Sequence, residues 1–443
     1  MSTRDMSAGL AELARRPLPE NVFAASVNAI LNVVGTSIGA SQHAAVDVVV
    51  RTALEHGAPG HSPVPGRSER VDLTSAALAT GLAAHLDDFD DTHLATVVHP
   101  AAASFAAALA LASQRKLTGR RFVESVALGI EAQLRVAVAM TPWHYDRGWH
   151  ITGTVGSLGA AVTAGILIDL DDDQLLNAIA IASSLSLGHR EGFGTMVKSF
   201  HPGKSAGNGL LAASLAKNRF TGSADALEGP RGYFAALSPE VDLTRLTEGL
   251  GKRWELLDNT FKPYPCGIVS HPAIEAAEGL HSRFDGASPS AVRVHCHPLV
   301  VELTGNPEPR TGLAARFSTI HGVAAGLTDG IVGIDQYADD RVTALDVTAV
   351  RAITTLVADD EIARDAATVE VELTDGQVID QHVEHARGSL ARPMSDDELD
   401  SKVAALIERS LPGRASSVIA TTRALPQADD CDSFLSAIVP EAR

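Results

Sequence analysis

The pattern of hydrophobic and polar positions changes once along the chain, near residue 265. From about residue 18 to residue 262, apolar residues recur at helical spacing and short Gly, Pro or Asp segments interrupt them. We predict a first helix between Pro19 and Gly39. Further helices are expected at about 100–113, 118–139, 153–168, 171–187 and 203–218. Small residues on one flank of the 153–168 segment predict close helix packing.

After residue 265, β-branched residues begin to alternate with polar ones. This pattern predicts strands at 291–297, 368–373 and 378–383, and Asp375-Gly376 between the last two predicts a hairpin turn. Helical spacing appears at 313–330 and 346–357. From Ser395 the pattern is helical again, since Ser395 and Glu398 form a capping-box signature before an apolar run.

These patterns predict a mainly α fold with two domains. The larger is all helical and built from both chain ends, residues 1–262 and 396–443, and a smaller α+β lid domain of residues 263–395 is inserted. A pocket is expected at the wall between the two domains.

Composition and charge exclude several classes of protein. Apolar residues make up 45% of the chain and charged residues 20%, which supports a large core and excludes an extended disordered chain. The formal net charge of −18 excludes a broad basic face for nucleic acid or anionic lipid. Any basic site must therefore be local.

The cysteines and the N-terminal sequence point to a cytoplasmic protein. The three cysteines lie far apart without a C-x-x-C pair, so neither a disulfide framework nor a cysteine zinc site is indicated. The N-terminus lacks an apolar secretory run. Residues 92–114 and 148–168 lack Asp, Glu, Lys and Arg, but we expect helices buried in protein and not in lipid.

The densest polar cluster is Asp-Asp-Phe-Asp-Asp-Thr-His at residues 87–93, followed by His99. Asp87, Asp88 and Asp91 match the spacing of magnesium-binding aspartates in helical prenyl-diphosphate enzymes. The low aromatic content of 4% does not favour an isoprenoid cavity. Two other interpretations stay open: Asp87 and Asp90 lie at a solvated helix end, or the carboxylates are buried beside the histidines.

Two further clusters lie beside predicted helix starts. Residues 145–150 place His150 where its ring can point into a cleft, although an isolated histidine is more often only packed. Lys198 and Lys204 flank the predicted start of the 203–218 helix, which is unfavourable for the helix dipole unless an anion binds between them. The alternative is that both lysines are simply solvated.

A fourth cluster lies at residues 262–272, where the composition changes. Its two prolines fit a hinge, which competes with a catalytic role for Tyr264 and Cys266. No Cys–His–Asn order supports Cys266 as a nucleophile.

Four ordered motifs together resemble the MmgE/PrpD family. They are D-F-D-D-T followed by H-P, G-W-H-x-T-G-T-V-G-S-L-G-A-A, M-V-K-S-F-H-P-G-K-S-A, and K-P-Y-P-C-G-x-x-x-H-P. The family includes 2-methylcitrate dehydratases, cis-aconitate decarboxylases and an iminodisuccinate epimerase. The resemblance implies a helical body with an α+β lid, a homodimer, and chemistry on a small polycarboxylate without a metal or organic cofactor.

The resemblance also implies a set of site residues. The decarboxylase-like pocket would comprise Asp88, Thr92, His99, His150, Lys198 and His271, and Tyr145 falls where epimerase-like members place a catalytic tyrosine. This chain departs from the decarboxylases twice. The segment from Thr92 to His99 is one residue longer, and His321 stands where they carry a tyrosine.

We assign roles from the chemistry of proton transfer beside a carboxylate. A group with a pKa near the working pH must move the proton, and fixed cations must hold the enolate-like charge. His150 and His99 are the acid and base candidates, with Tyr145 as a second proton carrier. Groups expected to contact substrate or orient the acid and base are Lys198, Lys204, His271, Thr92, Asp88 and, from the lid side, His321.

The sequence therefore predicts a hydro-lyase acting on a 2-methylcitrate-like acid. Decarboxylation of a cis-aconitate-type acid and epimerisation of an iminodisuccinate-type acid stay open within the family. A non-catalytic ligand-binding homologue is the alternative of another class.

Overall fold

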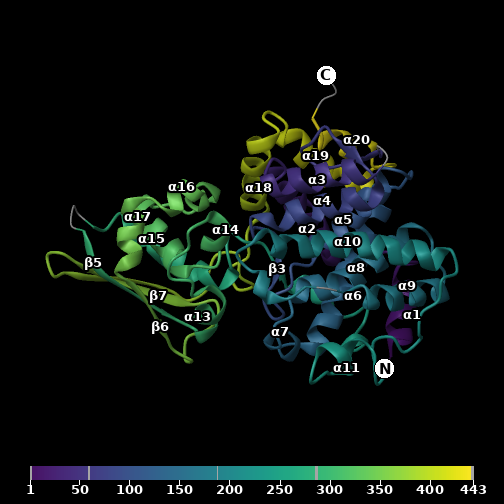
Figure 1. Cartoon of the computed structure of the whole chain (residues 1–443), viewed down its shortest axis with the longest axis horizontal. Coiled ribbons are helices and arrows are strands. Elements are labelled where there is room, and N and C mark those ends of the chain that lie inside the picture. The colour runs from purple at the N-terminus through teal and green to yellow at the C-terminus, as the bar shows by residue number, and fades with distance from the viewer. Residues whose placement is uncertain (1, 58–59, 187, 285–287, 441–443) are drawn as a thin grey trace.

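The protein is mainly helical, as the computed structural model in Figure 1 shows for residues 2–57, 60–186, 188–284 and 288–440. Most helices gather in a helical part on the right of Figure 1, and a sheet with its own helices lies on the left. The helices up to residue 237 are α1 (Thr3–Leu13), α2 (Glu20–Gly39), α3 (Ala44–His56), α4 (Leu73–Leu86), α5 (Ala101–Ala112), α6 (Gly119–Met140), α7 (Trp143–Asp146), α8 (Ile151–Leu167), α9 (Asp172–Ser184), α10 (Met196–Lys217) and α11 (Tyr233–Leu237).

The predicted helices agree with these bounds where the sequence carries capping signals. Thr118 caps α6 by accepting from the Arg121 amide, and Asp171 forms a capping box with Gln174 at the start of α9. The predicted end of α9, residue 187, lies outside the described residues. Helix α1 escaped the sequence analysis although Ser2 and Asp5 form a capping box before it. Charged residues of both signs lie among its apolar residues, so the apolar periodicity alone does not indicate this helix.

The predicted start of α10 at residue 203 is wrong. The helix begins at Met196, where Thr195 accepts from the Val197 amide, and it continues through Pro202. A proline inside a helix removes a hydrogen bond to the residue four positions earlier, and close packing against α4 holds the helix in place there. A Cβ atom on Gly81 of α4 would lie 2.7 Å from Gly203 Cα. Lys198 and His201 consequently lie on one continuous helix.

The sheet has the strand order β6-β5-β7-β8. Its strands are β5 (Pro289–Cys296), β6 (Thr354–Ala358), β7 (Ala367–Leu373) and β8 (Val378–Val383). The predicted hairpin is confirmed, with Gly376 at a φ of 87° in the turn between β7 and β8. Alternate side chains of β5 and β7 are buried, and the other face carries ion pairs such as Arg293 with Glu370.

Two helix predictions around the sheet need correction. The predicted helix at 346–357 ends at Ala352, and β6 follows it, paired in parallel with β5. Its β-branched residues Thr354, Thr355 and Val357 favour a strand once a partner strand is present. The predicted helix at 313–330 is divided in two, because Ser318 caps a new helix after a short break. The helices here are α12 (His271–His281), α13 (Pro298–Thr304), α14 (Gly312–Ala315), α15 (Thr319–Asp329), α16 (Asp339–Val342) and α17 (Leu345–Ala352).

The C-terminal segment returns to the helical part. The capping box of Ser395 with Glu398 is confirmed at the start of α18 (Asp396–Ser410), which is followed by α19 (Ala415–Ala424) and α20 (Asp432–Ala437). Helix α18 packs directly on α2, since a Cβ on Gly35 would lie 3.0 Å from Val403. Residues from both ends of the chain therefore share one hydrophobic core, and the sheet has a separate core of its own.

The apolar helices are accounted for by packing inside the protein. Among the described residues, α2 is the one helix long and apolar enough by composition to cross a membrane, and 72% of its apolar window is buried. Helices α5 and α8, which lie in the two segments without charges, are buried along their whole length, as predicted. Cys266, Cys296 and Cys431 are buried free thiols.

Close helix packing gives a first test of the fold. Gly159 of α8 faces α6 so closely that an added Cβ would lie 2.7 Å from Gly129 O and 2.7 Å from Gln133 Nε2. Gly159→Ala is therefore expected to lower the free energy of unfolding by about 1–3 kcal/mol, measured by thermal or urea denaturation. Gly279→Ala in α12 is the matched control, because its Cβ would meet nothing closer than 3.7 Å. That substitution should stabilise by about 0.5–1 kcal/mol. Equal losses in both variants would contradict this packing.

Candidate active site

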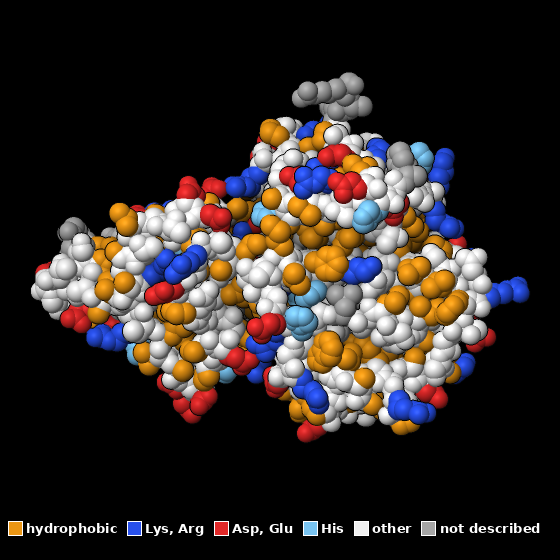
Figure 2. Space-filling view, in the orientation of Figure 1, with side chains coloured by type: hydrophobic (Ala, Val, Ile, Leu, Met, Phe, Trp, Pro, Cys, Tyr) orange, Lys and Arg blue, Asp and Glu red, His pale blue; other side chains and the backbone are white. Residues whose placement is uncertain are grey.

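A small cavity lies where the helical part meets the sheet-bearing part, and its volume is about 50 Å³. On the face in Figure 2, acidic, basic and histidine side chains gather close to the line where the two parts meet. The cavity is lined by Asp88, Thr92, Val97, His99, Tyr145, His150, Phe193, Lys198, Lys262, Gly267, Ile268, Val269, Leu303, Thr304 and Phe317.

Asp88 is held between two buried lysines. Lys198 Nζ lies 2.5 Å from Asp88 Oδ1, and Lys262 Nζ lies 3.1 Å from Asp88 Oδ2 and donates to the Asp88 carbonyl at 2.9 Å. Burial acts to raise the pKa of Asp88, but the two ammonium groups outweigh it and hold that pKa well below its usual range. Two ammonium groups face one carboxylate here, so this part of the cavity can attract a second carboxylate.

The backbone is strained on the same side of the cavity. Asp88 has a φ of 48° and Val97 a φ of 53°, and both residues line the cavity. A left-handed conformation is a genuine outlier for a β-branched residue such as valine. Such strain persists only where surrounding contacts determine it, and here Lys262 binds the Asp88 carbonyl.

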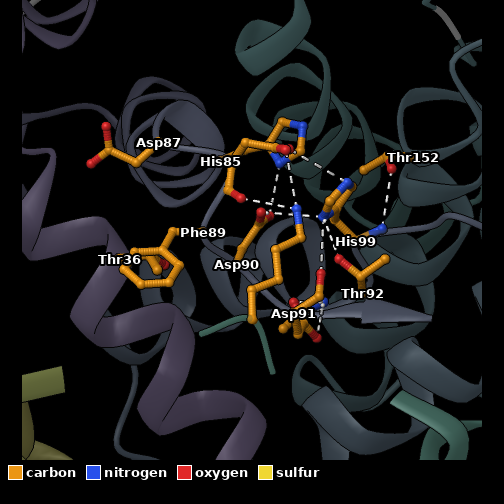
Figure 3. A network of polar contacts seen from close by, with 12 residues as sticks. Thr36, His85, Asp87, Phe89, Asp90, Asp91, Thr92, His99 and Thr152 are labelled. Atoms are coloured by element: carbon orange, nitrogen blue, oxygen red, sulfur yellow. Dashed lines mark hydrogen bonds and ion pairs between the residues drawn. The ribbon is translucent and has the colours of Figure 1, made fainter. Parts of the chain in front are cut away.

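Asp90 orients two histidine rings at once. Its Oδ2 accepts from His85 Nδ1 at 2.8 Å, and its Oδ1 lies 3.2 Å from His99 Nδ1. Figure 3 shows the three side chains facing one another, whereas Asp87 and Phe89 point away from them. All three are buried, and the His85 and His99 rings meet edge to face with centroids 4.5 Å apart.

The neighbours of His99 determine its tautomer. Three oxygens surround its Nδ1, from Asp91 O at 2.9 Å, Thr92 Oγ1 at 3.2 Å and Asp90 Oδ1 at 3.2 Å. Carbonyl and carboxylate oxygens only accept hydrogen bonds, so the proton lies on Nδ1. The His99 Nε2 atom therefore carries a lone pair, and it lies 3.8 Å from Asp88 Oδ1.

His150 stands immediately before α8 and pairs with a second histidine. Its Nδ1 lies 2.8 Å from His201 Nδ1, and the ring stacks on His85 with centroids 5.8 Å apart. Phe193 packs edge to face against the same ring. The sequence analysis placed His150 at a helix start facing a cleft, and its ring does line the cavity.

Tyr145 contributes a phenol that keeps its proton. Burial raises its pKa well above the usual range, although the Arg190 guanidinium, 4.1 Å from the ring centroid, acts in the opposite direction. A phenol in this state can donate a hydrogen bond but is a poor base at neutral pH. This placement fits a hydrogen-bond donor at the cavity wall better than a proton carrier.

The positive charge of the cavity comes from lysines, because the histidines are neutral. Burial lowers the pKa of His85 to about 4 and that of His150 well below its usual value, and it lowers that of His99 although Asp90 acts to raise it. Each ring is therefore uncharged at neutral pH. A bound polycarboxylate would raise these pKa values by bringing negative charge close.

The buried histidines predict a loss of stability in acid. Burial lowers the pKa to about 4 for His85, His144, His201 and His321. Between pH 6.5 and pH 4 the unfolded chain binds more protons than the folded one, so stability present above pH 6.5 is lost as the pH falls. Each such histidine contributes up to about 1.4 kcal/mol per pH unit. The Tm should fall steeply from pH 7 to pH 5, and less steeply in His321→Gln. A Tm independent of pH over this range would contradict the neutral rings.

Six of the residues chosen from the sequence come together at the cavity, and three do not. Those at the cavity are Asp88, Thr92, His99, Tyr145, His150 and Lys198. His271 is buried outside the lining, where its Nε2 donates to Cys266 O at 3.4 Å. His321 donates from Nε2 to Gln336 O at 2.9 Å and packs against Tyr337. Lys204 lies six residues after Lys198 on α10, on another side of the helix and outside the lining.

Four groups at or beside the cavity were not assigned from the sequence. Lys262 begins the K-P-Y-P motif and lines the cavity, so the motif itself was a usable signal. His201 lies within the quoted K-S-F-H-P motif. His85 ends an apolar helix, where nothing distinguishes it from a packed histidine. Lys402 of α18 donates to Phe89 O and Asn32 Oδ1, both at 2.8 Å. The sequence does not indicate this contact, because Lys402 lies more than 300 residues after both partners.

The aspartates of residues 87–91 are neither a solvated helix end nor a shared binding site for diphosphate. Asp88, Asp90 and Asp91 are buried, so the solvated interpretation is wrong for Asp90, and Asp87 pairs with Arg316. Asp91 accepts from Asn259 at 2.6 Å, and burial raises its pKa to about 7. The carboxylates that match the magnesium spacing thus have three different sets of partners.

One group of side chains at the cavity has the composition of a metal site. His85, Asp88, Asp90 and His99 place ligand atoms within 4.8 Å of one another. The donor set fits a divalent cation poorly, because Asp88 already faces two ammonium groups and the Nδ1 atoms of both histidines face Asp90. A cation there would have to displace or repel two lysines.

The fold and the cavity together define a class: mainly helical proteins in which a buried site combines histidines, lysines and a carboxylate. The chain belongs to the MmgE/PrpD family. It matches the MmgE/PrpD N-terminal domain over residues 4–246 and the MmgE/PrpD C-terminal domain over residues 264–425.

Similar proteins include cis-aconitate decarboxylases, which are lyases. The chain is 25% identical over 429 residues to that of Aspergillus terreus, covering 90% of this chain and 87% of that protein. It is 27% identical over 393 residues to that of Mus musculus (84% and 79%) and 26% identical over 387 residues to that of Homo sapiens (82% and 78%). These similarities support a lyase role at the level of the family.

Proposed function

We propose that the chain is a lyase that decarboxylates a small tricarboxylic acid of the cis-aconitate type. The observation that carries this proposal is the pair of buried lysines around Asp88. One carboxylate does not saturate two ammonium groups, so a substrate carboxylate gains a charge-assisted contact on entering the cavity. The similarity to cis-aconitate decarboxylases favours decarboxylation over the dehydration expected from the sequence.

In this reaction one carboxylate leaves as carbon dioxide and one proton joins the remaining carbon skeleton. The bond to the departing carboxylate breaks, its electron pair stays on the skeleton, and a protein acid supplies the proton. His150 is our candidate for this acid, and Lys198 and Lys262 would hold the carboxylate that receives negative charge in the transition state. The apolar side chains of Phe193, Ile268 and Phe317 would keep water from the departing group.

Dehydration of a 2-methylcitrate-like acid is the second candidate, and the tautomer of His99 favours it. A dehydratase needs a base for the proton beside the carboxylate, and His99 Nε2 carries a lone pair toward Asp88 in the cavity. The same atom would serve an epimerase.

One experiment separates these reactions. The purified protein is incubated with cis-aconitate, 2-methylcitrate and iminodisuccinate while released carbon dioxide, alkene absorbance and optical rotation are followed. Carbon dioxide from cis-aconitate supports the proposal, and alkene formation from 2-methylcitrate without carbon dioxide replaces it by dehydration. A change of optical rotation alone indicates epimerisation. Absence of turnover on all three acids rejects the proposal and favours a ligand-binding homologue.

We also propose that residues 263–395 act as a lid domain on a body of residues 1–262 and 396–443. The cavity lies between the two groups of residues, which is the position a lid would cover. A homodimer and catalysis without a metal or organic cofactor stay predictions from the family resemblance, and a cytoplasmic location stays a prediction from the cysteines and the N-terminal sequence. Light scattering measures the first, and activity after dialysis against EDTA measures the dependence on metal.

A further inference from the structure

The cavity of the candidate active site is smaller than the acid proposed to react in it. Its volume of about 50 Å³ has room for about four water molecules. Sites that enclose a small molecule usually measure about 300–1,000 Å³. If the proposed function holds, on which this inference rests for the size of the ligand, the cavity must open before a tricarboxylate can bind.

A larger cleft of about 700 Å³ lies directly outside this cavity, and we refer to it as the outer cleft. Its wall includes Arg190, Glu191 and Gly194 from the helical part and Glu302, Asn306 and Ala314 from the sheet-bearing part. Phe193, Leu303 and Phe317 line both the outer cleft and the cavity. These three side chains therefore form the partition between the two spaces.

Two aromatic rings meet across this partition, one from each part of the protein. The ring centroids of Phe193 and Phe317 lie 5.3 Å apart, within the range of stabilising aromatic pairs. Lys198 Nζ lies 5.5 Å from the Phe193 centroid and 5.1 Å from the Phe317 centroid. The paired rings thus cover the ammonium group that we assign to the substrate carboxylate.

Neither ring is held by a helix or a strand. Phe193 lies in the short connection before α10, and Phe317 lies in the turn between α14 and α15. Gly188 and Gly194 flank Phe193 with φ angles of 111° and 78°. Glycine allows such backbone angles and changes between them at low steric cost. Loops that open and close over enzyme sites turn about a few residues of this kind.

An ion pair joins the same two parts beside the rings. Arg190 Nη2 lies 3.1 Å from Glu302 Oε1 of α13. The Glu302 side chain is 53% exposed, and ion pairs this open to water contribute little to stability. The pair therefore favours the closed arrangement of the partition without locking it.

We infer that the acid reaches the cavity through the outer cleft, and that Phe193 and Phe317 form a gate that must open to admit it. The pair of Arg190 with Glu302 helps to hold the gate closed. When the gate is closed, Lys198 is covered and water is kept from the reacting groups. The opening of the gate, and not the encounter with the acid, then limits the rate of entry at high concentration.

Stopped-flow binding of tricarballylate tests the gate apart from any reaction, because this saturated tricarboxylate lacks the double bond of cis-aconitate. Tryptophan fluorescence reports binding, since the Trp149 backbone pairs with His189 of the outer cleft. With rising concentration, the observed rate should reach a plateau equal to the rate of gate opening. Phe317→Ala should raise this plateau about two- to tenfold, which corresponds to the loss of one aromatic pair. Phe220 is exposed and outside both linings, so the control Phe220→Ala should leave the plateau unchanged.

Two further variants separate the gate from effects on folding. Phe317→Leu keeps an apolar side chain but removes the ring, so the plateau should rise while the Tm stays close to that of the parent. Glu302→Gln removes the ion pair and should raise the plateau by up to about fivefold. Glu308→Gln removes the same charge from an exposed residue outside both linings, and it should leave the plateau unchanged.

Three results would overturn the gate. They are an observed rate that rises linearly without a plateau, a plateau equal in the parent and both Phe317 variants, and absence of tricarballylate binding in calorimetry. The proposed function is tested separately by turnover. If the parent turns over no cis-aconitate, the proposed function fails, and a plateau raised in the Phe317 variants still supports the gate.

Discussion

Replacement of His150 by Gln is expected to lower kcat on cis-aconitate by about 10²- to 10⁴-fold. Glutamine retains a polar group of similar reach but cannot take up and release a proton. His150 lines the cavity, and its ring is held between His85, His201 and Phe193. Initial rates of carbon dioxide release at saturating substrate measure the effect.

The control for this substitution is His61→Gln, because His61 is exposed and lies outside the cavity lining. That variant should retain the parent kcat. Thermal denaturation of both variants separates loss of chemistry from loss of folding. A His150→Gln protein with the parent rate would remove His150 from the reaction and leave His99 as the remaining imidazole of the cavity.

Lys198→Met is expected to give the second large effect, a fall in kcat/KM of about 10²- to 10³-fold. A fixed cation that meets developing negative charge contributes about this much in a site that excludes water. The substitution also removes one of the two partners of Asp88, and breaking a buried ion pair costs up to about 3–5 kcal/mol. Lys262 remains at 3.1 Å, so a loss of stability below that range is expected.

A double variant separates catalysis from stability at this position. Lys198→Met combined with Asp88→Asn removes both charges of the pair, so the Tm should recover toward that of the parent while turnover stays low. Lys217→Met, at the exposed end of the same helix, should change neither quantity. Recovery of turnover in the double variant would show that Lys198 acts only by neutralising Asp88.

The sequence was most informative where a motif and a helix start coincide. His150 was chosen at a predicted helix entry, and His99 was chosen because it follows the aspartate cluster in a family motif. Both residues lie just before a helix, and a residue at a helix start has a position that local sequence largely determines. Lys198 and Lys204 were chosen together, because both were expected near the start of one helix. The observed start of α10 at Met196 places both lysines inside the helix, on different sides of it. The helix runs through Pro202 because tertiary contacts between Gly81 and Gly203 compensate the proline, and no local pattern records such contacts.

The parts of the site that escaped the sequence depend on contacts between distant segments. Asp90 was interpreted equally as solvated or buried, because the sequence does not show that His85 and His99 converge on it. Lys402 reaches the loop of residues 87–91 from the far end of the chain. His271 and His321 followed from the family pattern, yet each uses its ring to satisfy a backbone carbonyl outside the cavity lining.

The two walls of the cavity differ in a way that matters for protein engineering. Every ionisable side chain in its described lining precedes residue 263, whereas the later residues contribute only Gly267, Ile268, Val269, Leu303, Thr304 and Phe317. Reactivity and shape selection are thus encoded in separate stretches of the gene. A library restricted to Leu303, Thr304 and Phe317 would vary the size of molecule that fits the cavity while leaving the titrating groups untouched.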